Sequence, residues 1–143
     1  MNIRNAILTD IPALQELEQQ CNPSPWSAAQ LSSSINTLQP VWVIDQPEHG
    51  IIAMLVWQKL PDEAEIHLLN THPAHRRQGY AQQLLEHLFQ WAQQHHINRI
   101  LLEVRASNNG ALQLYKHNGF QRCGLRKNYY HNGEDAVLME KPC

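Results

Sequence analysis

A short basic segment with a single glycine, Arg76-Arg77-Gln78-Gly79-Tyr80-Ala81, directly precedes a stretch with helical periodicity. Gly79 has no Cβ, so an anion could approach its backbone closely. The first turn of a helix presents N–H groups without intrahelical partners and a partial positive charge, and both attract anions. The segment therefore predicts a pyrophosphate site, with a basic turn that only caps a helix as the alternative. It lacks the Lys-Ser or Lys-Thr of a Walker loop and the repeated glycines of a dinucleotide fingerprint.

A carboxylate interrupts the apolar run Leu101-Leu102-Glu103-Val104. Burying a carboxylate is unfavourable unless the group is paired or used in chemistry. Glu103 falls near the C-terminal end of a predicted strand, which is the end where open α/β sheets bind ligands. It is therefore a candidate general base. The alternative is a glutamate that emerges at the sheet edge and pairs with Arg99 or Arg105.

Two further polar residues follow this run. Asn108 lies between the predicted strand and the next predicted helix, so it either contacts a ligand or caps that helix. Tyr115 lies on the apolar stripe of the same helix with Leu114, so it is either a proton donor or a core tyrosine. His67 and His72 fall on opposite faces of a predicted strand, and the sequence therefore predicts no metal site near them.

The elements that would position these residues follow from hydrophobic periodicity and turn residues. Strands are expected at 3–8, 41–44, 51–58, 65–71, 99–104, 120–123 and 136–139. Helices are expected at 9–21, 26–35, 81–92 and 109–118, with a side-chain cap opening the first, Ser27 capping the second and Gly119 ending the last.

This order describes an antiparallel meander, one parallel βαβ crossover and a closing hairpin. The nearly all-apolar run at 99–104 predicts a strand that is buried on both faces. The predicted fold class is α/β (α+β), with a mixed, mostly antiparallel sheet and helices on both faces. We expect one domain over residues 1–143.

Composition narrows the class of protein. The chain has 143 residues, of which 43% are hydrophobic and 17% are charged, and this composition is ordinary for a globular domain. The net charge is −2, so the chain has no basic surface field that would favour nucleic-acid binding. No apolar run approaches the length of about 20 residues that spans a bilayer, and no apolar signal region follows Met1. Cys21, Cys123 and Cys143 form no CxxC motif. These features predict a reduced, cytoplasmic protein.

Together the segments resemble the GNAT superfamily of acyl-CoA N-acyltransferases. The cofactor loop of that family reads Arg/Gln-x-x-Gly-x-Gly/Ala at the entry to a long helix, as residues 76–81 do here. A downstream Asn-x-x-Ala-x-x-x-Tyr pattern also matches, at Asn108, Ala111 and Tyr115. The resemblance implies that acetyl-CoA is held by Leu69, Asn70, Thr71, Arg76, Arg77, Gln78, Gly79, Tyr80, Ala81, Gln82 and Asn108.

Within the superfamily the chain resembles the bacterial ribosomal-protein-alanine N-acetyltransferases. The matching segments are Pro25-Trp26-Ser27, Glu103 to Asn108, Leu114 to Phe120, Arg126 to Tyr130 and Gly133 to Ala136. The resemblance implies acetylation of the N-terminal alanine of small-subunit ribosomal protein number eighteen, or of another protein, without a metal. Glu103 would act as the base, Tyr115 as the acid, and Trp26, Tyr129 and Tyr130 would contact the acceptor, although Trp26 and Tyr129 could equally be core residues.

The resemblance also leaves alternatives. Asn70 and His72 depart from the family pattern before the loop, which affects side-chain details at the acetyl end. The acceptor could be a small-molecule amine instead of a protein, or the chain could be a non-catalytic acyl-CoA-binding regulatory module. We expect a monomer or weak dimer without direct nucleic-acid or membrane partners.

Overall fold

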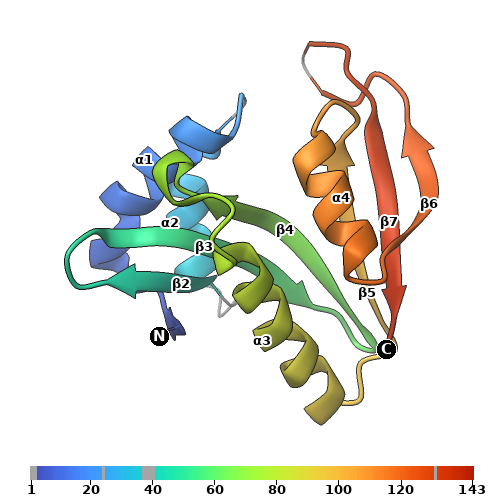
Figure 1. Cartoon of the computed structure of the whole chain (residues 1–143), viewed down its shortest axis with the longest axis horizontal. Helices are drawn as coiled ribbons and strands as arrows, with labels where there is room; N and C mark the ends of the chain where they lie inside the picture. Colours follow the sequence, from blue (N-terminus) through green and yellow to red (C-terminus); the bar gives the residue numbers. More distant parts are fainter. Residues whose placement is uncertain (1–2, 24, 37–40, 131) are drawn as a thin grey trace. The chain divides into compact units, whose positions relative to one another are not determined.

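The computed structural model describes residues 3–23, 25–36, 41–130 and 132–143 (Figure 1). Its strands are β1 (Ile3–Asn5), β2 (Val41–Gln46), β3 (Gly50–Lys59), β4 (Glu63–Thr71), β5 (Arg99–Arg105), β6 (Gln121–Arg126) and β7 (Ala136–Pro142). Its helices are α1 (Ile11–Cys21), α2 (Ala28–Asn36), α3 (Tyr80–Gln94) and α4 (Asn109–His117), with short 3-10 turns η1 (Leu8–Asp10) and η2 (Pro73–His75).

Across the described residues the strands join in the order β1-β2-β3-β4-β5-β7-β6. The β4–β5 pair is parallel, and the pairs β1–β2, β2–β3, β5–β7 and β6–β7 are antiparallel. This confirms the predicted mixed sheet with one parallel crossover. The chain forms two compact units, one of Met1–Gln58 with His67–Leu88 and the other of Lys59–Ile66 with Phe89–Cys143. The single domain over 1–143 stays a prediction.

In the first unit, helices cover both faces of the β2–β3 pair. Leu14 and Leu17 of α1 and Leu31 of α2 pack with Val43 into one apolar cluster. Neighbouring residues of a strand face opposite sides. Accordingly, the Trp42 ring lies on the other side and contacts His87 of α3, with ring centroids 4.4 Å apart. The predicted helices on both faces are therefore confirmed.

The two N-terminal helices begin differently. Ser27 caps α2 as predicted, because its Oγ accepts the Gln30 N–H at 3.2 Å while the Gln30 side chain accepts the Ser27 N–H at 2.8 Å. The predicted side-chain cap of α1 is wrong, because Asp10 stands at the N-cap without a side-chain cap bond. Its carboxylate instead accepts the Ile7 N–H at 2.8 Å and pairs with Arg4.

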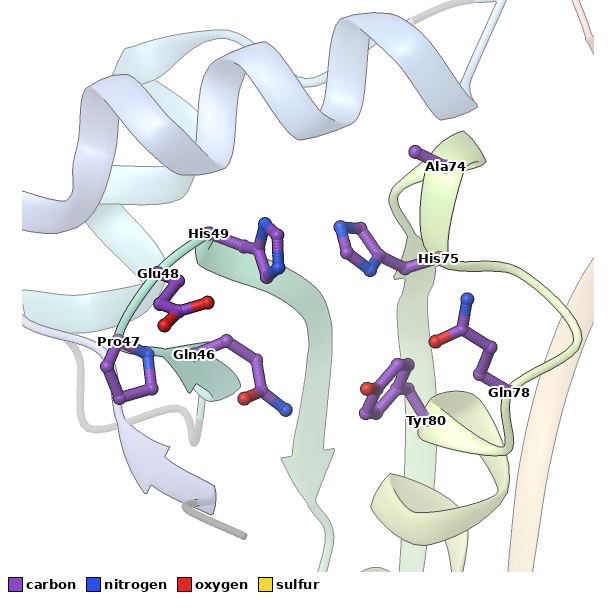
Figure 2. A pocket seen from close by; sticks show the side chains of 8 residues that line it. All are labelled: Gln46, Pro47, Glu48, His49, Ala74, His75, Gln78 and Tyr80. Carbon is purple, nitrogen blue, oxygen red and sulfur yellow. The ribbon is translucent and has the colours of Figure 1, made fainter.

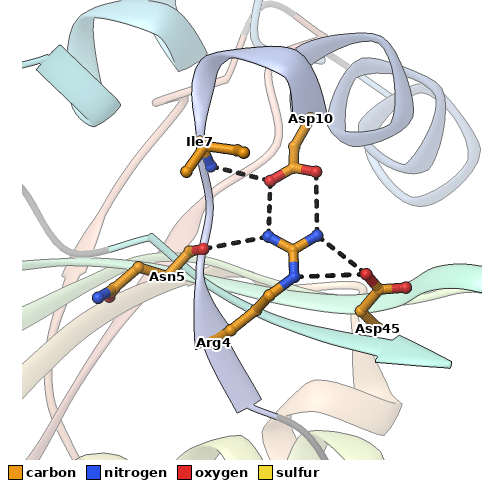
Figure 3. Close-up of polar contacts among 5 residues, drawn as sticks. All are labelled: Arg4, Asn5, Ile7, Asp10 and Asp45. Carbon is orange, nitrogen blue, oxygen red and sulfur yellow. Dashed lines mark hydrogen bonds and ion pairs between the residues drawn. The ribbon is translucent and has the colours of Figure 1, made fainter.

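Arg4 joins the edge strand β1 to both α1 and β2 (Figure 3). Its guanidinium lies 2.8 Å from Asp10 and 3.0 Å from Asp45. The Arg4 hydrogen bond lowers the pKa of Asp10, and the same bond is the largest cause that raises the pKa of Arg4. Because η1 begins at Leu8, the strand predicted over 3–8 ends early, at Asn5.

In the second unit, β5 is hydrogen-bonded to β4 on one side and to β7 on the other. The strand alternates: Ile100, Leu102 and Val104 are buried, whereas Leu101 and Glu103 are partly exposed. The prediction of burial on both faces is therefore wrong. Leu101 made the run look continuous, because an apolar residue can occupy a half-covered face.

The C-terminal end of α4 is fixed to β7. Gly119 adopts a φ of +91°, a left-handed conformation that ends the helix as predicted. Lys141 of β7 donates to the Asn118 carbonyl at 2.7 Å. No helix in the described ranges is both long and apolar enough to cross a membrane.

Candidate active site

The predicted pyrophosphate loop lies between η2 and the first turn of α3. Gly79 has a φ of +86°, and a Cβ at this position would meet nothing within 4 Å. The backbone conformation therefore requires the glycine, and the space in front of it is open. The Gln83 N–H donates to the Gly79 carbonyl at 3.0 Å, so the helical bonding begins here. Helix geometry then leaves the first N–H groups after Gly79 without intrahelical acceptors.

The two arginines of this loop are held differently. Arg76 donates from Nε to the Thr71 carbonyl at 3.3 Å, and its Nη2 lies 3.6 Å from the Cys21 Sγ. Arg77 is exposed and adopts a positive φ of 64°. Arg76 is thus tied to the end of β4, whereas Arg77 supplies charge at the surface of the loop.

A pocket of about 570 Å³ adjoins this loop within the first unit (Figure 2). Its walls come from the β2–β3 hairpin and from the segment that enters α3, and they consist of Gln46, Pro47, Glu48, His49, Ala74, His75, Gln78 and Tyr80. His49 and His75 face each other from the two walls, with ring centroids 4.9 Å apart. Of the predicted site residues, Gln78 and Tyr80 line it. This pocket could not be predicted from the sequence, because its two walls come from separate segments, at 46–49 and 74–80.

The end of β4 presents two different faces. Leu69 and Thr71 are partly exposed, whereas Asn70 between them is buried. The Asn70 amide donates to the Glu18 carboxylate at 2.9 Å. The unusual Asn70 side chain therefore lies on the opposite face of the strand from Leu69 and Thr71, and only its backbone is left for the predicted cofactor contact.

Glu18 is a residue that the sequence reasoning missed. It is 0% exposed, and it also accepts the Trp26 N–H at 2.6 Å and the Asn22 amide at 3.3 Å. Its spacing could have revealed it, because Glu18 falls four residues after Leu14 on the apolar stripe of α1. A carboxylate on such a stripe needs buried donors.

In the second unit, Glu103 of β5 pairs with Arg126 of β6, with 3.3 Å between Oε1 and Nε. The Glu103 side chain is 24% exposed. The expected alternative partners are engaged elsewhere, since Arg99 bonds Glu63 and Glu140, and Arg105 lies 3.3 Å from Glu134. The alternative prediction that Glu103 forms an ion pair is thus confirmed, and the pair that the structure shows is with Arg126, which was not among the expected partners.

Two predicted acceptor residues lie beside this ion pair. The Arg126 guanidinium is 5.3 Å from the centre of the exposed Tyr129 ring, and the Tyr129 and Tyr130 rings meet edge to face at 5.1 Å. The Arg105 guanidinium covers the Tyr130 ring at 3.8 Å. Burial raises the pKa of Tyr130, and the nearby Glu103 carboxylate adds to this increase. The structure therefore brings Glu103, Tyr129 and Tyr130 together.

The other predicted residues of this unit lie on α4. Asn108 caps the helix, with its Oδ1 accepting the Ala111 N–H at 3.2 Å. Tyr115 is 6% exposed and packs edge to face on Phe120 at 5.4 Å. Burial raises the pKa of Tyr115, so its phenol holds its proton at neutral pH. Both structural alternatives, a cap and a core tyrosine, are thus realised, and the additional roles of Asn108 and Tyr115 stay predictions.

Trp26 is half-buried against the core of the first unit, where its ring lies 6.1 Å from that of His67. The alternative prediction, that Trp26 is a core residue, is therefore partly realised. No group of three or more His, Cys, Asp or Glu in residues 3–23, 25–36, 41–130 and 132–143 is arranged to hold a metal ion.

The sequence model of the Acetyltransferase (GNAT) family matches residues 11–120. The chain belongs to the GNAT family. A [ribosomal protein bS18]-alanine N-acetyltransferase of Escherichia coli K12 is 34% identical over 137 residues, which cover 94% of this chain and 92% of that protein. A protein of the same name from Haemophilus ducreyi is 36% identical over 141 residues, covering 96% and 97%.

The fold agrees with this family. The crystal structure of the ribosomal-protein-S18-alanine N-acetyltransferase from Escherichia coli superimposes with a TM-score of 0.89 at 33% identity, covering 99% of this chain and 92% of that one. The expected GNAT resemblance and fold class are therefore confirmed. As a GNAT acetyltransferase, the chain is an enzyme that uses acetyl-CoA as its acetyl donor.

The loop of this GNAT chain has the chemistry that a pyrophosphate requires. The left-handed Gly79 leaves open space, the α3 N-terminus supplies N–H donors, and Arg77 adds an exposed positive charge. The residues present therefore fit acetyl-CoA at residues 76–82.

Proposed function

We propose that this GNAT enzyme acetylates the N-terminal α-amine of a protein, with the N-terminal alanine of ribosomal protein bS18 as its first candidate acceptor. The observation that carries the proposal is the grouping of Glu103, Tyr129 and Tyr130 in one unit, where the Arg126 guanidinium pairs with the partly exposed Glu103 carboxylate and contacts the exposed Tyr129 ring. The identity of 34–36% to bS18-alanine N-acetyltransferases over nearly the whole chain supports the same acceptor.

In this proposal the first unit holds the acetyl donor. The N–H groups at the start of α3 and the Arg77 guanidinium bind the pyrophosphate. The backbone of residues 69–71 binds the acetyl group and the pantetheine arm, and Asn108 is proposed as a further coenzyme A contact. The partly exposed face of Leu69 and Thr71 supports this role for β4.

The chemistry needs no protein nucleophile. Glu103 takes a proton from the α-ammonium group, directly or through a water, and exposes the lone pair of the nitrogen. A free α-amine has a pKa of about 7.7–8.0, so a modest base suffices. The nitrogen attacks the thioester carbonyl, the new C–N bond forms, the nitrogen releases its second proton to water and the C–S bond breaks. Tyr115, whose phenol burial keeps protonated, donates its proton to the leaving thiolate and regains one from water.

The acceptor is tested by following thiol release from acetyl-CoA with a peptide copied from the start of bS18 and with a panel of small amines. We expect release with the peptide, and tandem mass spectrometry should place one acetyl group on the α-nitrogen of its alanine. The same peptide with a blocked N-terminus is the control and should release no thiol. Release with small amines alone would contradict the proposal.

The proposal places the reaction in the cytoplasm, where bacterial ribosomal proteins are made, with the enzyme acting as a monomer or weak dimer. Size-exclusion chromatography with light scattering measures the oligomeric state. A tight, larger assembly would contradict this part.

A further inference from the structure

The carboxylate of Glu18 is fully buried in the first unit, yet no step of the proposed reaction uses it. It receives hydrogen bonds from the Asn70 amide at 2.9 Å, from the Trp26 N–H at 2.6 Å and from the Asn22 amide at 3.3 Å. A buried carboxylate is strongly unfavourable without such donors. These donors therefore fix both the carboxylate and the segments that supply them.

Two of the three donors to Glu18 belong to the two segments that would hold the two substrates, whereas Asn22 lies at the end of α1 itself. Asn70 lies on β4 between Leu69 and Thr71, whose backbone is proposed to bind the acetyl end of the donor. Trp26 lies in the segment that is proposed to contact the acceptor. One carboxylate on α1 thus joins a donor-binding strand to an acceptor-binding segment.

A second set of contacts lies one turn further along α1. The Cys21 thiol donates to the Thr71 carbonyl at 3.3 Å, and the Arg76 Nε donates to the same oxygen at 3.3 Å. Burial raises the pKa of Cys21, so the thiol keeps the proton that this bond needs. The last turns of α1 therefore hold both the end of β4 and the first residue of the pyrophosphate loop.

We infer that Glu18 is a positioning residue. It fixes the position of the donor-binding end of β4 through Asn70, and it fixes the position of the acceptor segment through Trp26. This inference rests on the proposed function. Glu18 does not touch the reacting atoms, and its effect on turnover passes through these two hydrogen-bonded neighbours. Small displacements of substrate-holding groups can lower rates by about a hundredfold, so such a residue would matter for catalysis.

The link to β4 can be broken while the link to Trp26 is kept. Asn70→Ala removes only the link to β4, so we expect the KM for acetyl-CoA and the Kd for coenzyme A to rise about tenfold, with the KM for the peptide unchanged. Glu18→Ala removes both links, so the KM values of both substrates should rise. This split between the two variants is what a merely structural role would not produce.

A conservative variant should restore function. In Glu18→Gln, the amide oxygen can still accept the Trp26 N–H, and the amide nitrogen can donate to the Asn70 side chain once that amide turns over. The volume is unchanged and both links persist. We therefore expect KM values within about threefold of the wild type, although the charge is gone.

Asp10→Ala is the matched control. It removes a carboxylate from the other end of α1 and breaks the tie to Arg4 (Figure 3). It should lower stability without changing either KM. Each variant is measured at equal folded concentration, which circular dichroism and thermal unfolding establish. If Glu18→Ala does not fold, Asn70→Ala and Glu18→Gln still decide the question.

The inference is overturned if Asn70→Ala binds coenzyme A as the wild type does, or if Glu18→Ala and Asp10→Ala change the KM values alike. Calorimetric binding of coenzyme A needs no acceptor. If the wild type binds coenzyme A but acetylates no alanine-starting peptide, the proposed acceptor fails, while the coenzyme A affinities of Asn70→Ala and Glu18→Gln still test the link to β4.

Discussion

Glu103 stands in an ion pair with Arg126 and is also the proposed base, so a structural and a chemical role make different predictions for it. We expect Glu103→Gln to lower kcat by about 10²–10³-fold, because a neutral amide cannot accept the proton of the amine. The Kd of coenzyme A should not change. Steady-state kinetics with the bS18 peptide and calorimetry measure the two quantities.

The control for this variant is Glu140→Gln. Glu140 is also a strand glutamate of the second unit, and it pairs with Arg99 at 2.8 Å. Its loss should leave kcat within about twofold, because an exposed ion pair contributes little. Equal turnover of wild type and Glu103→Gln at saturating peptide would remove the assignment of the base.

Tyr115 offers a second test at the level of a single atom. Tyr115→Phe keeps the ring that packs on Phe120 and removes only the hydroxyl. We expect kcat to fall by about 10²-fold with the midpoint of thermal unfolding nearly unchanged, because the leaving thiolate loses its proton donor while the core keeps its volume. A large loss of stability with normal turnover of the folded fraction would instead show that the hydroxyl serves the core.

The predicted pyrophosphate loop depends on a left-handed glycine at the start of α3. Gly79→Ala forces an L side chain into a φ of +86°, which costs about 1 kcal/mol or shifts the loop. Either outcome moves the N–H groups at the start of α3, and we expect the Kd for coenzyme A to rise at least about fivefold.

Gly50→Ala is the matched control for the loop variant. Gly50 also has a positive φ, of +72°, and open space around it, but it lies in the β2–β3 hairpin. Its substitution should lower stability by a similar amount and leave the Kd for coenzyme A unchanged. If both variants weaken coenzyme A binding equally, the loop has no special role in holding the donor.

Local patterns were enough to predict the elements. The helix expected over 81–92 is α3 at Tyr80–Gln94, and the strand expected over 99–104 is β5 at Arg99–Arg105, because apolar spacing depends only on near neighbours. Ion partners depend on register, which apolar spacing does not reveal, and the sequence therefore did not indicate Arg126 as a partner of Glu103. Glu103 meets Arg126 only because β7 brings β5 and β6 into one sheet.

In the candidate site, too, neighbours along the chain could be predicted, whereas contacts between distant segments could not. The left-handed turn at Gly79 before a helix could be predicted, since a glycine, arginines and a helix start are adjacent in the chain, and the binding of coenzyme A by residues 76–82 stays a prediction. Glu18 could not be assigned a partner, because its donors Asn70 and Trp26 lie 52 and 8 residues away. Side-chain hydrogen bonds of this kind follow from packing and leave no periodic trace in the sequence.

For the whole molecule, the Arg4–Asp10 pair predicts how stability depends on pH. The pKa of Asp10 is lowered by Arg4 in the folded state, so the unfolded chain takes up a proton first as the pH falls. Stability from this pair is complete above the ordinary aspartate pKa of about 3.9 and is lost as the pH falls through the lower folded value. Urea unfolding at pH 7, 5 and 3 measures it.

We expect Asp10→Asn to be less stable than the wild type by about 1 kcal/mol at pH 7, with the difference disappearing toward pH 2. Glu16→Gln, at an exposed position of the same helix, should not alter the shape of the pH profile. A difference between Asp10→Asn and the wild type that stays constant from pH 7 to pH 2 would mean that packing, and not the charge, carries the effect.

The position of β7 has a consequence for the newly made chain. Because β7 lies between β5 and β6, both strands leave the ribosome before the strand that joins them. Until residues 136–142 have emerged, Glu103 and Arg126 stand on strands with nothing between them, and two sheet edges stay open. The grouping of Glu103, Tyr129 and Tyr130 therefore forms only after residues 136–142 have left the ribosome, and any activity that needs this grouping waits for β7.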